Sequence, residues 1–171
     1  MIRGAVLSAC GRYRWLLTRS WGTRSPREAD LVFVGCNPST ADEHADDATV
    51  RKWAGFAGRW GFTGFTVVNA FGWRATDVAE LAEAPDPVGP RCDHHLLEVA
   101  RRAQLVVPCW GSASKLPPRL RPRLVEVAAA LRRVEAHRHG RFRAFGYTQG
   151  GDPSHPLMLT YATPLAPWPS G

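Results

Sequence analysis

The stretch LVFVGCNPST, Leu31–Thr40, decides the fold class that this sequence predicts. Its opening residues, Leu-Val-Phe-Val, are of the buried type and are typical of a strand covered on both faces, as in a parallel sheet. The polar residues Gly-Cys-Asn-Pro-Ser begin where that strand should end. In open α/β sheets, ligands bind at the carboxyl ends of the strands. We therefore expect a strand over residues 31–34 and a functional loop directly after it.

The rest of the chain alternates between strand and helix patterns. Apolar runs predict further strands over residues 65–68, 104–107 and 142–145. Apolar residues at helical spacing and a capping Asp46 or Asp47 predict a helix over residues 47–59, and Thr76 or Asp77 caps a short helix through residue 81. Further helices are predicted over residues 91–103 and 120–136. Such alternation forms βαβ units. The sequence thus predicts an α/β fold, a three-layer single domain with a mainly parallel central sheet of about four strands flanked by helices.

The N-terminal residues precede this alternating core. The stretch CGRYRWLLTRSW alternates, which places Tyr13, Trp15 and Leu17 on one side and Arg12 and Arg14 on the other. It is interpreted as an extended strand, at the edge of the sheet, before a polar connector over residues 23–30. The 171 residues fit one domain (1–171), with 1–30 as strand and connector and 31–159 as the core. The final TPLAPWPSG is expected to be irregular.

The charge of the chain favours a polyanionic partner. The formal net charge is +7 and the isoelectric point is about 9.9, with lysine only at Lys52 and Lys115. The planar guanidinium group of arginine suits phosphate, so nucleic acid, and here DNA in single- or double-stranded form, is the expected partner. An arginine-rich composition spread evenly over a solvated surface remains an alternative.

The cysteines and the hydropathy pattern exclude other classes. The chain has four cysteines and no C-x-x-C pair, so we expect neither a structural zinc nor an iron-sulfur site, and no other cofactor. No apolar segment approaches the roughly 20 residues that span a bilayer, and the N-terminus lacks a signal-peptide pattern. We therefore expect a cytoplasmic monomer without a membrane partner.

Each expected core strand ends in residues that can take part in chemistry. They are Asn37, Asn69, the turn at residues 110–112 and His155. Because parallel strands share one carboxyl edge, these loops should converge. Each residue taken alone could instead have a purely structural role. Asn37 could cap a helix, Asn69 could stabilise a turn, and a lone histidine is often structural. Their joint placement favours a site.

The strand-end motifs also resemble known families. The order VGCNPS, VVNA, WGSASK and SHPL resembles the uracil-DNA glycosylase superfamily, over about residues 31–159. The pattern NPSTAD, DDAT, RATD, PVGP and HPL is more similar to an uncharacterised bacterial domain family of unknown function. The first resemblance implies a uracil-DNA-glycosylase-like fold and a role in DNA repair.

That resemblance implies a role for each strand-end residue, since such enzymes turn a nucleotide out of the stack into a pocket. Asn69 would read the base, because an amide offers a donor and an acceptor to a uracil-like edge. Asn37 would position the water, although an amide cannot take a proton, so activation should be weak. His155 would hold O2 of the departing base.

Further residues would contact the base. Cys36 would lie beside it in the first loop, and Phe71 and Trp73 would stack on it. Aromatic residues just beyond a strand also pack inside a protein, and this alternative remains open.

The DNA backbone and duplex would be contacted by other loops. Backbone amides at helix starts, particularly at Ser39 and Ser112, would bind phosphate, aided by Lys115 and the dipole of the following helix. Leu157 and Met158 occupy the position at which related enzymes insert an apolar wedge into the duplex. Both are equally plausible as core residues.

The acidic segment ADEHADD departs from a DNA-facing surface. One of Asp42, Asp46 and Asp47 could supply the missing base. Alternatively, Arg74 pairs with Asp46 or Asp47 inside the protein.

Rival functions remain beside the glycosylase interpretation. Cys36 could be the nucleophile of a cysteine hydrolase with His155 as its base. The chain could instead be a catalytically silent module that binds nucleic acid or nucleotide, or an enzyme acting on a free nucleoside or nucleotide. We expect a hydrolase that cleaves the N-glycosidic bond of a deaminated or modified base in DNA.

Overall fold

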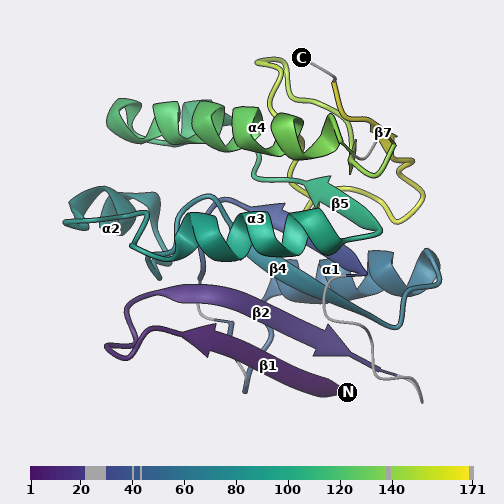
Figure 1. Cartoon of the computed structure of the whole chain (residues 1–171), viewed down its shortest axis with the longest axis horizontal. Helices are drawn as coiled ribbons and strands as arrows, with labels where there is room; N and C mark the ends of the chain where they lie inside the picture. The colour runs from purple at the N-terminus through teal and green to yellow at the C-terminus, as the bar shows by residue number, and fades with distance from the viewer. Residues whose placement is uncertain (22–29, 40, 43, 138–139, 170–171) are drawn as a thin grey trace.

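The computed structural model describes residues 1–21, 30–39, 41–42, 44–137 and 140–169. Most of the expected connector, residues 23–29, lies outside these ranges. The described chain forms one five-stranded sheet, a separate two-stranded sheet and flanking helices (Figure 1). This arrangement confirms the α/β class.

The larger sheet is mixed rather than mainly parallel. The strands of both sheets are β1 (Ile2–Leu7), β2 (Arg14–Ser20), β3 (Leu31–Gly35), β4 (Gly64–Asn69), β5 (Leu105–Pro108), β6 (Arg143–Ala144) and β7 (Ala166–Pro167). The order in the larger sheet is β1-β2-β4-β3-β5. β3 pairs in parallel with β4 and β5, whereas β2 runs antiparallel to β1 and β4. The parallel part is thus the predicted core, and the N-terminal hairpin extends it.

Two of the predicted strands differ from the prediction in their place in the sheet or in their length. The N-terminal strand β2 is internal, because the unpredicted β1 pairs along its outer side and forms the edge. The strand expected over residues 142–145 is reduced to β6. Phe142 makes a single parallel bridge to Val106 of β5, after which the chain turns away to pair with β7. β7 lies in the tail that was expected to be irregular.

The helices agree closely with the sequence pattern. They are α1 (Ala48–Arg59), α2 (Val78–Glu83), α3 (Cys92–Arg102) and α4 (Arg121–Glu135). Asp47 caps α1 by accepting a 2.8 Å hydrogen bond from the amide of Val50. Asp77 caps α2 in a capping box with Glu80. Within the described residues, none of the helices has both the length and the apolar character that crossing a membrane requires.

The helices cover the two faces of the sheet through separate apolar clusters. Val32 and Val34 of β3 face the cluster formed with α2, α3 and α4. Leu31 and Phe33 face the other way, onto α1. All of β3 is therefore buried, as expected for a strand that is covered on both faces.

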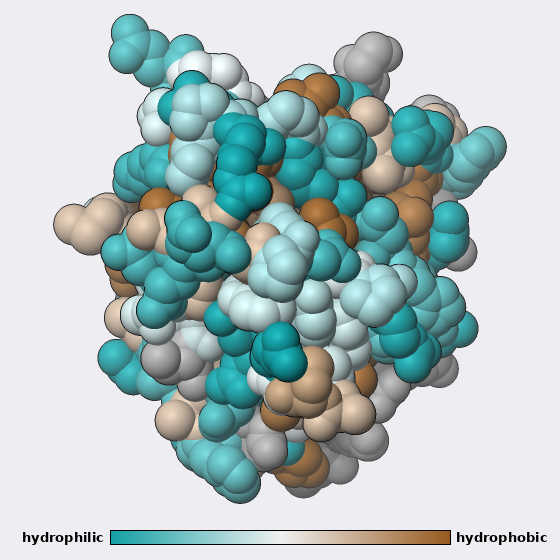
Figure 2. Space-filling model, turned by 90° about the vertical axis from the view of Figure 1, so that its left-hand side faces the viewer, coloured by the Kyte–Doolittle hydropathy of each residue, from teal (hydrophilic) through white to brown (hydrophobic). Residues whose placement is uncertain are grey.

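The strand ends meet at one edge of the sheet. The last residues of β3 and β4, Gly35 and Asn69, are paired in register. β2 runs the opposite way, so its first residue, Arg14, lies at the same edge, and its amide donates to the carbonyl of Gly72 at 3.0 Å. In Figure 1 the arrowhead of β2 points right and that of β1 points left, the direction shared by β3, β4 and β5. The side they point toward is mostly hydrophilic in Figure 2, with hydrophobic residues in small separate areas.

Candidate functional site

A pocket of about 160 Å³ lies at this carboxyl edge. Residues from several strand-end loops line it, including the predicted Asn37, Asn69, His155, Cys36 and Ser39. An engineered cavity of roughly 150 Å³ holds one benzene molecule, so the volume suits a single six-membered ring. Three of the four predicted strand-end positions, Asn37, Asn69 and His155, therefore meet at one pocket, whereas the turn at residues 110–112 does not line it.

Asn69 brings an unpaired donor into the pocket. It is only 4% exposed, and its Nδ2 has no hydrogen-bond partner in the described part of the chain. Its partner in the sheet register is Gly35, where a Cβ atom would lie 2.7 Å from Asn69 Oδ1. The glycine thus makes room for the amide. A buried donor without a partner costs free energy, which a ligand acceptor would recover.

Asn37 joins two strand-end loops. Its Nδ2 donates to the carbonyl of Ala75 at 2.8 Å and to that of Pro38 at 3.1 Å. These bonds fix the orientation of the amide and leave Oδ1 as the free acceptor among the described groups. Asn37 does not cap the following helix, since Asp47 does so.

His155 is held in its neutral form. Burial lowers its pKa from the ordinary value, and the charge of Lys115 lowers it further, against the opposing effect of Asp47. The amide of Leu157 donates to Nδ1 at 3.3 Å, which assigns the ring proton to Nε2. Gly111 packs against it with a φ of +82°, and a Cβ there would lie 3.2 Å from the His155 Cβ. The third strand-end loop thus positions the histidine without lining the pocket.

The acidic segment supplies one carboxylate to the pocket. Asp46 pairs with the buried Arg19 at 2.7 Å, and Asp42 pairs with Arg74 at 3.9 Å. The alternative in which Arg74 pairs with Asp46 or Asp47 is therefore wrong, because Arg74 pairs with Asp42. Asp47 lines the pocket while it caps α1.

Arg14 belongs to the site, although its sequence pattern did not predict this. Its side chain lines the pocket and is only 3% exposed, and burial lowers its pKa to about 10. Nη1 donates to the carbonyl of Ala41, and Nε has no partner among the described residues. It was missed because only strand ends were considered, whereas the antiparallel β2 brings its beginning to this edge.

Five more residues line the pocket without having been predicted to do so. Thr49 and Thr76 add hydroxyl groups, and Gly35, Trp53 and Ala75 form part of the wall.

The two predicted stacking residues do not line this pocket. Phe71 is 1% exposed and belongs to the core, which rules out stacking on a ligand in this structure. Trp73 lines a neighbouring pocket of about 270 Å³ together with Arg12 and Arg74. Ser39 lines both pockets, so they adjoin.

The expected phosphate cradles at helix starts are absent from the described residues. Ser112 begins a three-residue 3-10 helix, η1 (Ala113–Lys115), and α4 starts only at Arg121. The amide of Ala113 donates to Asp152 at 2.8 Å, and that of Ser114 donates to Ser112 Oγ at 3.3 Å. Ser39 likewise precedes α1 by several residues. Neither serine therefore offers a helix terminus to phosphate.

The predicted wedge residues lie on the surface. Leu157 is 40% and Met158 is 89% exposed, so neither is a core residue. Insertion into a duplex remains a prediction.

Cys36 has the properties of a protonated thiol. Burial raises its pKa to about 12. A cysteine nucleophile must be a thiolate near neutral pH. The cysteine-hydrolase alternative therefore finds no support in the pocket.

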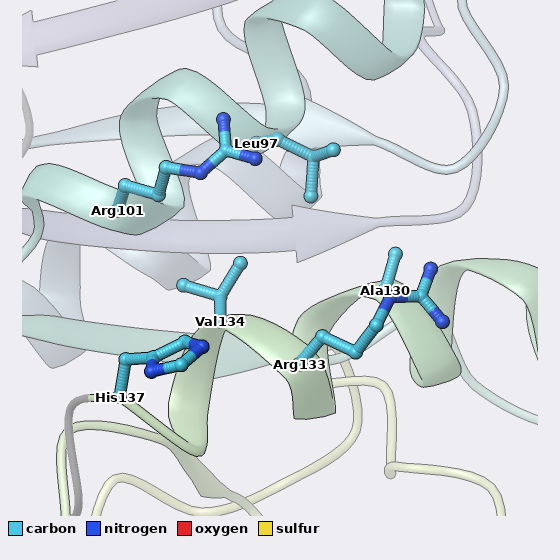
Figure 3. Close-up of a pocket in the computed structure, with 6 residues that line it drawn as sticks. All are labelled: Leu97, Arg101, Ala130, Arg133, Val134 and His137. Atoms are coloured by element: carbon cyan, nitrogen blue, oxygen red, sulfur yellow. The ribbon is translucent and has the colours of Figure 1, made fainter.

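A larger pocket of about 530 Å³ lies between α3 and α4 (Figure 3). It is lined by Leu97, Arg101, Ala130, Arg133, Val134 and His137. Neither a carboxylate nor an amide side chain is among these residues, so this groove offers His137 without the carboxylate and amide groups that the strand-end pocket gathers. Nor do the described residues contain a group of three or more His, Cys, Asp or Glu that could hold a metal ion.

Comparison with known proteins identifies one family. A family model described as a protein of unknown function, DUF1643, matches residues 14–157. The matched segment begins at Arg14 and includes every residue that lines the strand-end pocket. No curated protein and no solved structure matches the chain.

Proposed function

The chain belongs to DUF1643, a family of proteins of unknown function, and we propose that its strand-end pocket hydrolyses the N-glycosidic bond of a deaminated or modified base in DNA. The convergence of Asn37, Asn69 and His155 on one ring-sized pocket carries this proposal. The glycosylase resemblance itself rests on short motifs. The uracil-DNA-glycosylase-like fold is therefore part of the proposal.

Asn69 is the proposed base-reading residue. Its buried Nδ2 lacks a partner among the described residues, and a carbonyl oxygen of a base would satisfy it. Its Oδ1 can accept from a ring N–H at the same edge. A ligand that presents an acceptor beside a donor, as a uracil-like edge does, therefore fits this amide.

Asp47 and Asn37 are the proposed water-binding groups. The carboxylate of Asp47 can take a proton, which the amide of Asn37 cannot. The free Oδ1 of Asn37 can accept a hydrogen bond from the same water. The oxygen of that water would bond to C1′ of the sugar while its proton passes to Asp47. The pocket thus supplies the carboxylate that the sequence motifs alone lacked.

His155 is the proposed donor to the departing base. In its neutral form it carries the proton on Nε2 and can donate without adding a charge to the resting pocket. A preorganised donor at a developing negative charge contributes about 3 kcal/mol to the transition state, or roughly 100- to 1,000-fold in rate.

The adjoining pocket supports a DNA strand as the substrate. Arg12 and Arg74 line it, and Trp73 offers an aromatic surface there. Guanidinium groups bind phosphate, and aromatic rings stack on bases of single strands. Trp73 is thus proposed to contact a neighbouring nucleotide rather than the base in the pocket.

A base-release assay tests the proposal. Oligonucleotides that carry different deaminated or damaged bases are incubated with the protein, and abasic sites are detected by alkaline cleavage. We expect release from at least one of them, with a loss of about 100-fold or more in Asn37→Ala and His155→Ala and an altered base preference in Asn69→Asp. DNA binding should persist in these variants, and Cys36→Ala should remain active.

Retained turnover in both Asn37→Ala and His155→Ala would exclude the mechanism. Salt-sensitive binding without release from any oligonucleotide would instead favour the silent binding module.

A further inference from the structure

β2 carries two buried arginines that differ in their surroundings. Arg19 is 1% exposed and donates to the carboxylate of Asp46 and to several backbone carbonyls. Arg14 is 3% exposed and donates to the carbonyl of Ala41, while its Nε has no partner among the described groups. A buried charge without a counter-ion is strongly disfavoured unless a ligand compensates it.

Nearby carboxylates offset the burial of Arg14 only in part, and none forms an ion pair with it. Asp46 pairs with Arg19, and Asp42 pairs with Arg74. Asp47 lines the same pocket as Arg14, and its negative charge raises the pKa of Arg14 against the effect of burial, yet no ion pair joins the two side chains. The pocket therefore presents a cation and a carboxylate that are kept apart.

We propose, building on the function proposed above, that Arg14 binds the negative charge of the base in this pocket and so selects bases that depart as stable anions. In hydrolysis the C1′–N bond breaks and its electron pair passes to the base, while the water oxygen bonds to C1′ and its proton passes to Asp47. The departing base is an anion until solvent protonates it, and Asp47 returns its proton to solvent. Arg14 and the Nδ2 of Asn69 are buried donors that can receive this anion together with the Nε2 of His155.

Equilibrium binding of free bases tests this role without any turnover. Calorimetric titration compares uracil with barbiturate, a similar ring that is an anion at neutral pH, and with inorganic phosphate. We expect the protein to bind barbiturate about 10- to 100-fold more tightly than uracil, as for a hydrogen bond to a charged group. This wild-type comparison does not depend on how any variant folds.

Two variants test whether Arg14 causes the preference for barbiturate over uracil. Arg14→Gln should abolish this preference. Arg141→Gln should keep it, because Arg141 also donates to one backbone carbonyl, that of Ala103 at 3.1 Å, but does not line the pocket.

Equal affinity of the wild type for uracil and barbiturate, or an unchanged preference in Arg14→Gln, would overturn the proposal. Phosphate that binds as tightly as barbiturate and depends equally on Arg14 would also overturn it, since the site would then be a phosphate site. A preference for barbiturate without base release from any oligonucleotide would contradict the proposed hydrolysis but would still support binding of an anionic base by Arg14.

Discussion

At the scale of single residues, the pocket depends on the missing side chain of Gly35. A Cβ atom there would lie 2.7 Å from Asn69 Oδ1 and 3.5 Å from the ring of Trp53. Both neighbours line the pocket, so any added atom would displace the amide that is proposed to read the base.

Gly35→Ala should therefore impair function more than stability. We expect a loss of about 1–3 kcal/mol in the free energy of unfolding from overpacking. Base release, or barbiturate binding, should fall by about 100-fold, because small misplacements of binding groups are costly. Gly150→Ala is the matched control, since its nearest neighbour, Asp152 Oδ2, would be 3.6 Å away. Calorimetry that shows unchanged ligand binding in Gly35→Ala would contradict the proposed contact between the Asn69 amide and the base.

At the scale of elements, the start of α1 combines a structural and a proposed chemical role in Asp47. The side chain caps the helix through Val50 and also lines the pocket. The two roles need different properties, since capping needs an acceptor oxygen and proton transfer needs a carboxylate.

Asp47→Asn separates these roles. Asparagine caps helices as well as aspartate does, so the melting temperature should change little. Base release should fall by about 100- to 10,000-fold with the loss of the general base. Asp47→Ala should lose the same activity and also about 1 kcal/mol of stability. Full activity in Asp47→Asn, with the cap intact, would remove Asp47 from the mechanism.

The elements also show how far the sequence predicts this fold. β3, β4 and the four helices follow from local patterns, with capping residues at α1 and α2 only, and they agree with the structure within a few residues. β1 forms a hairpin with β2, but its glycine and largely exposed pattern did not indicate a strand. The antiparallel pairing of β2 with β4 is non-local, so local patterns did not reveal it, and the position of Arg14 at the carboxyl edge was missed with it. Phe71 was misassigned because a strand-end aromatic residue can point to either side of the loop.

At the scale of the whole molecule, half-buried histidines should make stability depend on pH. Burial lowers the pKa values of His155 and His95 below their ordinary value of 6.5. The unfolded chain therefore binds protons at a higher pH than the folded chain does. The stability from the neutral histidines is fully present above pH 6.5 and is lost as the pH falls below it.

Thermal unfolding between about pH 7.5 and about pH 5.5 measures this effect. We expect the melting temperature to fall as the solution is acidified through this range. The double variant His95→Gln, His155→Gln should show a weaker dependence. If the melting temperature changes equally with pH in the double variant and the wild type, these two histidines do not control the pH dependence of stability.

The proposed function requires that a nucleobase occupies the strand-end pocket. The most direct measurement is a crystal structure of the protein with bound barbiturate. We expect a ring in the pocket, with one oxygen within hydrogen-bond distance of Asn69 Nδ2 and its negative charge facing Arg14. A ring bound elsewhere, for example in the larger groove between α3 and α4, with the strand-end pocket free of it, would show that this pocket does not bind the base.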